Sequence, residues 1–118
     1  MEYKYLDLAS RDGVSIVRFK QAKIIDQVIS DNIAKELSQA ELDSAGNRKL
    51  LLNFQGVTFL TSAMLGKLLQ LGKLCKNDKI QLKLCSICPP LMDVFKISQL
   101  HEVFSIEPDE AAGVAAFA

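Results

Sequence analysis

Residues 50–66 read LLLNFQGVTFLTSAMLG, and they combine a strand, a loop and the start of a helix. The apolar run at 50–54 is short and continuous, which is typical of a central strand buried on both faces. Gly56 marks the loop, and Thr61 and Ser62 precede apolar residues at helical spacing. A serine oxygen there lies beside unpaired backbone N–H groups. Ser62 can therefore cap the helix or carry a phosphate.

Periodic patterns on both sides of this stretch predict alternating strands and helices. Apolar and polar residues alternate at 3–8 and at 14–19, on either side of the turn signal Arg11-Asp12-Gly13. This pattern indicates a β-hairpin. An apolar stripe predicts a helix capped by Asp26 or Ser30 and ended by Ala45-Gly46-Asn47. The further elements expected are helices at about 62–77 and 91–97, and strands at 80–85 and 103–106.

This order predicts one α/β domain, with a mixed sheet of four to five strands packed with helices. The domain should fill residues 1–118, with its core at about 3–107 and a C-terminal tail or short helix at 108–118. The fourteen basic residues balance the fourteen acidic ones, so the formal net charge is zero. A nucleic-acid-binding domain normally has a basic excess, and we therefore expect neither nucleic acid nor a membrane surface as a partner.

The composition of the chain indicates the cellular compartment of the protein. Charged residues stand near the N-terminus, where a signal peptide would need its apolar core. No apolar run approaches the roughly 20 residues of a membrane span. Three cysteines are too few for a disulfide framework and fit a reducing compartment. The sequence thus predicts a cytoplasmic protein.

Enzymatic patterns are sparse, and we expect neither catalytic residues nor a cofactor or metal. His101 is the only histidine, and nothing in the sequence brings it near Ser62. The pair Cys85 and Cys88 has the C-x-x-C spacing of redox sites, although Cys85 alternates with core residues of a strand. Three cysteines and His101 lack the two close-spaced ligand couples of a structural zinc site.

Residues 57–66 resemble the signature of STAS domains, the family of bacterial anti-sigma factor antagonists. That signature is roughly V-x-F-[ML]-D-S-[ST]-G-[LI]-[GR]. Residues 85–95, CSICPPLMDVF, are similar to the strand, short loop, proline and helix that follow in the family. Residues 97–104, ISQLHEVF, are similar to its x-x-G-L-x-x-x-F ending.

The resemblance implies a protein–protein switch. In the family, the unphosphorylated antagonist binds an anti-sigma factor that is also an ATP-dependent serine kinase, and this frees a sigma factor. Phosphorylation of the serine at the helix start ends the binding. Ser62 falls on this phosphoacceptor, Thr61 is an alternative acceptor, and a serine phosphatase is a further partner. The implied partner-binding residues are Phe59, Leu60, Thr61, Ser62, Ala63 and Met64.

Several positions depart from the family pattern. Thr61 replaces the aspartate before the acceptor, Ala63 the second hydroxyl residue and Met64 the glycine, while Asn53 stands where the strand usually has aspartate. Two alternatives to the phosphorylated switch therefore stay open. One is a constitutive scaffold or signalling-complex subunit in which Ser62 only caps its helix. The other is a redox enzyme built on Cys85 and Cys88.

Overall fold

The computed structural model describes residues 4–20, 23–24, 27–43, 46 and 48–117. Its centre is a five-stranded sheet in the order β1-β2-β4-β6-β7. The strands of this sheet are Leu6–Arg11 (β1), Val14–Phe19 (β2), Lys49–Asn53 (β4), Gln81–Cys85 (β6) and Ser105–Glu107 (β7). β1 is antiparallel to β2, and every other neighbouring pair is parallel. The predicted hairpin and mixed sheet are confirmed.

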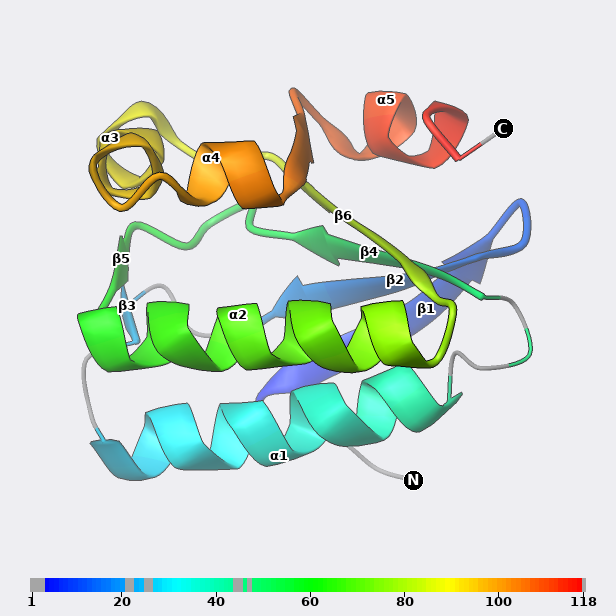
Figure 1. The fold of residues 1–118 in the computed structure, drawn as a ribbon, viewed down its shortest axis with the longest axis horizontal. Coiled ribbons are helices and arrows are strands. Elements are labelled where there is room, and N and C mark those ends of the chain that lie inside the picture. Colours follow the sequence, from blue (N-terminus) through cyan, green and yellow to red (C-terminus); the bar gives the residue numbers. More distant parts are fainter. Residues whose placement is uncertain (1–3, 21–22, 25–26, 44–45, 47, 118) are drawn as a thin grey trace.

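Five helices complete the described part of the fold: Gln27–Asp43 (α1), Ser62–Asn77 (α2), Pro89–Ile97 (α3), Leu100–Val103 (α4) and Glu110–Ala115 (α5). Figure 1 shows α1 and α2 side by side below the strands, with α3, α4 and α5 above them. Two short strands, Lys23–Ile24 (β3) and Phe59–Leu60 (β5), form a parallel pair, and β5 directly precedes α2 in the chain. The sequence did not predict this pair, because two residues are too few for a periodic signal.

β4 is the central strand, and its apolar run is buried on both faces as predicted. Leu50 and Leu52 belong to the large core, which also contains side chains of α1, α2 and α3. Leu51 belongs to a smaller core on the other face. Val114 and Phe117 cover that second face, so residues 108–118 include a packed short helix rather than a free tail.

A few boundaries differ from the predicted ones. Val103 is the last residue of helix α4, and the final strand begins only at Ser105. Ser30, one of the two proposed caps, is buried inside α1. The other cap, Asp26, lies outside the described residues, as do Ala45 and Asn47 of the predicted helix stop. In the described ranges, no helix is both long and apolar enough to cross a membrane.

Candidate functional site

A tight loop carries the chain from the end of β4 to the start of α2. The backbone N–H of Val57 donates to the Phe54 carbonyl at 2.9 Å and closes a turn. Gly56 has φ +87° in this turn, a conformation that favours glycine. β5 then leads directly into α2, at the end of the sheet toward which the arrow of β4 points (Figure 1). The loop is thus fixed at both ends.

Thr61, and not Ser62, is the N-cap of α2. Thr61 has extended backbone angles, and its Oγ1 accepts a hydrogen bond from the Met64 N–H at 3.2 Å. Both hydroxyl residues suit a cap, so sequence alone did not separate them. The idea that Ser62 serves only as a cap is therefore wrong. Aspartate and threonine are both good caps, so Thr61 can fill the capping role of the aspartate that the resemblance would lead us to expect at this position.

Ser62 occupies the first helical position, and its side chain is exposed. Its hydroxyl makes no hydrogen bond to any of the residues that the structure describes. Ala63 beside it is also exposed, and the first turn of α2 contains no acidic residue. The helix dipole and the free N–H groups of this turn favour a negative charge. The position is therefore accessible to an enzyme and tolerant of an added anion.

The predicted partner-binding residues divide into exposed and buried sets. Phe59 is 46% exposed, whereas Leu60 and Met64 are only 3% and 0% exposed and belong to the large core. The side chains of Leu60 and Met64 do not reach solvent, so they are not part of the exposed surface of this loop. They support the loop from beneath. We use "Ser62 surface" for the exposed or half-exposed residues Phe59, Thr61, Ser62 and Ala63.

Asn53 joins this loop to helix α5 through both ends of its amide. The side chain is 2% exposed. Its Oδ1 accepts from the Gln55 N–H at 2.8 Å, and its Nδ2 donates to Glu110 Oε1 at 3.0 Å. An aspartate, usual in the family at this position, would instead set two carboxylates against each other. The amide of Asn53 is therefore suited to hydrogen bonding with the Glu110 carboxylate. Glu110 is 57 residues away, and the sequence did not predict this contact.

Arginines complete the contacts of Glu110. Arg18 donates to both carboxylate oxygens of Glu110, from Nε at 3.0 Å and from a terminal nitrogen at 2.9 Å. Arg11 lies 3.8 Å away. Partial burial alone would raise the pKa of Glu110, but the hydrogen bonds from Asn53 and Arg18 and the two arginine charges hold this pKa below its usual value. This cluster fastens α5 to the sheet.

The cysteine pair is placed as structural thiols would be. Cys85 lies in the smaller core, whereas Cys88 packs against the large core and donates from Sγ to the Val57 carbonyl at 3.5 Å. Both thiols are free, and burial raises the pKa of Cys85 to about 11. A thiol with so high a pKa is a poor nucleophile at neutral pH, so the burial of Cys85 does not favour its use in redox chemistry.

His101 is exposed on the short helix α4. In the part of the chain that the structure describes, no hydrogen bond or ion pair joins His101 to Ser62. Within the described ranges, no group of three histidine, cysteine, aspartate or glutamate side chains is arranged to hold a metal ion. The loop before α2 therefore remains the candidate site.

Comparison with known proteins agrees with this geometry. The family model described as STAS domain matches residues 5–113. The Bordetella bronchiseptica protein BtrV, named as an anti-sigma factor antagonist, is 27% identical over 94 residues, which are 80% of this chain and 79% of BtrV.

Solved structures share the fold at lower identity. An anti-sigma factor antagonist from Mycobacterium paratuberculosis superimposes with a TM-score of 0.81 at 19% identity, covering 94% of this chain and 91% of its own. The Bacillus cell fate determinant SpoIIAA, in its phosphorylated form, gives a TM-score of 0.67 at 17% identity, covering 96% and 99%. The chain therefore belongs to the STAS domain family, and it shares its fold with proteins described as anti-sigma factor antagonists.

Proposed function

We propose that this protein is an anti-sigma factor antagonist whose binding to an anti-sigma factor is ended by phosphorylation of Ser62. The observation that carries the proposal is the free hydroxyl of Ser62, exposed at the first position of α2 while Thr61 provides the cap. The relatives' names support an anti-sigma factor as the partner. The phosphorylated form of SpoIIAA supports phosphorylation as the modification.

Phosphorylation at Ser62 would change the surface without disturbing the fold. A phosphoserine adds about −1.5 to −2 charge at pH 7. The start of α2 can accept this charge, because the helix dipole favours an anion there and the first turn has no acid. A partner seated on the Ser62 surface would instead have to desolvate the phosphate. The modification should therefore weaken docking and leave stability almost unchanged.

Ser62 is the favoured acceptor over Thr61. The Thr61 oxygen is engaged by the Met64 N–H at 3.2 Å, and its side chain is only half-exposed. Phosphorylation there would alter the cap itself. The kinase in this proposal is the anti-sigma factor, a serine phosphatase restores the hydroxyl, and release of a sigma factor changes transcription in the cytoplasm. The protein itself catalyses nothing.

Isothermal titration against the anti-sigma factor tests the proposal. We expect Ser62→Ala to bind like the wild type and Ser62→Asp to bind at least about tenfold more weakly, a change of about 1.4 kcal/mol. Ser10→Asp is the matched control, because Ser10 is an exposed serine on β1 and the charge change is the same. Thermal melts should show Ser62→Asp to be as stable as wild type, since an acid suits the first turn of a helix.

Equal affinities for wild type, Ser62→Ala and Ser62→Asp would contradict the switch. That result would favour the second candidate, a constitutive scaffold or signalling-complex subunit that binds without phosphorylation. The observation behind this alternative is Thr61, which keeps the cap but not the negative charge of the family's aspartate. A kinase that reads that charge would find no substrate here.

A further inference from the structure

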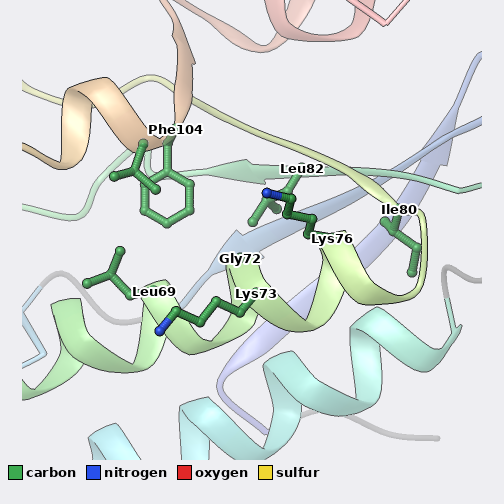
Figure 2. A pocket seen from close by; sticks show the side chains of 8 residues that line it. Leu69, Gly72, Lys73, Lys76, Ile80, Leu82 and Phe104 are labelled. Carbon is green, nitrogen blue, oxygen red and sulfur yellow. The ribbon is translucent and has the colours of Figure 1, made fainter.

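A cavity of about 400 Å³ opens at the other end of α2, between this helix, β6 and the end of α4 (Figure 2). It is separate from the Ser62 surface, since the two share no residue. Its walls are mainly apolar and come from α2, β6, the end of α4 and residues adjoining them. The apolar lining consists of Leu69, Gly72, Ile80, Leu82, Val103 and Phe104.

The topology of the sheet explains why this cavity is open. β7 pairs only with Lys83 to Cys85 of β6, so the earlier part of β6 lacks a strand on that side in the described chain. Leu82 lies in this uncovered part, and Ile80 directly precedes β6. Gly72 shapes the opposite wall, because a Cβ there would lie 3.1 Å from the Phe104 ring. The result is an apolar hollow of a size found in small-molecule sites.

Two cations border the hollow. Lys73 and Lys76 line the cavity, and both are exposed. Figure 2 shows Lys76 extending from α2 toward Leu82, and Lys73 running along α2 toward the side of Leu69. Neither forms an ion pair with a described residue, whereas Lys67 on the same helix is held by Asp31 at 2.9 Å. The helix dipole explains why lysines suit this end of α2 but not why they border an apolar cavity.

We infer that this cavity binds a free single-chain fatty acid, with the tail against Leu82 and Phe104 and the carboxylate held by Lys73 and Lys76. An apolar hollow with unpaired cations on its border is complementary to an amphiphilic anion and repels an amphiphilic cation. The site is independent of the proposed switch at Ser62. If the cavity does not bind a fatty acid, the proposed switch at Ser62 still stands. If Ser62 is not a switch, the inference about the cavity still stands.

Titration of the full chain with decanoate, below its micellar concentration, tests the inference. Calorimetry should detect saturable binding. The amide and methyl resonances of Leu69 and Leu82 should shift, and so should the amide and ring resonances of Phe104. Lengthening the acid should tighten binding by up to about fourfold for each buried methylene. Butyrate lacks the tail, and decyltrimethylammonium has the opposite charge. Both should bind at least about tenfold more weakly.

A pair of substitutions tests the lysines. Lys73→Glu with Lys76→Glu should weaken decanoate binding at least about tenfold. The matched control is Lys35→Glu with Lys96→Glu, which makes the same charge change at exposed lysines of α1 and α3. If the first pair does not fold, Lys73→Gln with Lys76→Gln replaces it.

Three results would overturn the inference: no saturable binding of decanoate, equal binding of decyltrimethylammonium, or unchanged affinity in the lysine variants. Resonance shifts confined to other parts of the molecule would also overturn it.

Discussion

At its N-terminal end helix α2 presents an exposed hydroxyl and free backbone N–H groups, whereas its C-terminal end meets two carboxyl groups. Glu41 of α1 is 1% exposed, and both its carboxylate oxygens lack a hydrogen-bond donor. Asp78, the C-cap of α2, lies beside it. The field of a helix favours anions at the first end and opposes them at the second. One helix therefore can accept an added anion at its N-terminal end and has two neighbouring carboxyl groups beside its C-cap at the other end.

These two carboxyl groups change how nearby groups titrate. Burial, followed by a hydrogen bond with Asp78 and by its charge, raises the pKa of Glu41 to about 7. The two carboxyl groups can share a hydrogen bond only when one of them carries a proton. Burial, followed by the charges of Glu41 and Asp78, also raises the pKa of the neighbouring thiol Cys75 to about 12. The N-terminal end can thus accept an added anion, while the C-terminal end makes stability depend on pH.

Removing the support beneath the N-terminal end should have the largest effect on stability. Met64 is fully buried in the large core. We expect Met64→Ala to lower the free energy of unfolding by about 2–5 kcal/mol, because it leaves a cavity. Denaturant unfolding measures this. The neighbouring control Ala63→Ser, at an exposed position, should stay within about 0.5 kcal/mol. A loss below about 1 kcal/mol for Met64→Ala would mean that the end of α2 is not anchored in this way.

The C-terminal end should give the next largest effect, through pH. The pKa of Glu41 is higher in the folded chain than in the unfolded one, so the unfolded chain releases this proton first as pH rises. Stability is therefore full below about pH 4.5, falls as pH rises toward about 7, and then levels off. We expect this loss to be about 2 kcal/mol between pH 5 and pH 8. Urea unfolding at a series of pH values measures it.

Glu41→Gln separates this carboxyl group from all the others. The variant should lose most of the decline between pH 5 and pH 8, since an amide does not titrate. Glu36→Gln is a less clean control for Glu41→Gln, because the substitution also changes the hydrogen bond that Glu36 accepts from the Tyr5 backbone N–H at 3.0 Å. A decline of the same size in Glu41→Gln and wild type would assign the pH dependence to other groups.

The smallest effects separate the two hydroxyl residues at the start of α2. Thr61→Ala should cost about 1 kcal/mol, because the Met64 N–H loses its partner. Ser62→Ala should stay within about 0.5 kcal/mol, because the Ser62 hydroxyl is not bonded in the described structure. Thermal denaturation of both variants makes the comparison. The reverse order would restore Ser62 as the cap and remove the structural basis of the switch.

The sequence predicted those parts of the fold that depend on local pattern. The bounds of α2 and the burial of β4 follow from periodicity and from continuous apolar residues, and both are confirmed. The position of Ser62 at the helix start was also predicted. The sequence did not predict that Thr61, and not Ser62, would be the N-cap, because both residue types are favoured at that position. Only the backbone angles distinguish the two residues.

Contacts between distant segments were beyond the sequence. Glu41 and Asp78 stand far apart along the chain, and nothing in their neighbourhoods marks them as partners. The match of Asn53 with Glu110 depends likewise on how α5 crosses the sheet. Packing also decides that Leu60 and Met64 lie under the loop and not on its surface. Such features depend on tertiary structure, which a periodic pattern does not encode.

Phosphopeptide mass spectrometry on the protein taken from its own cells, in growth and under stress, tests the central claim most directly. Peptides covering Phe54 to Lys73 contain both candidate acceptors. We expect phosphate on Ser62, with an occupancy that changes between the two conditions, and an unmodified Thr61. Complete coverage of these peptides with no phosphate on Ser62 in either condition would contradict the claim and leave a constitutive binding module.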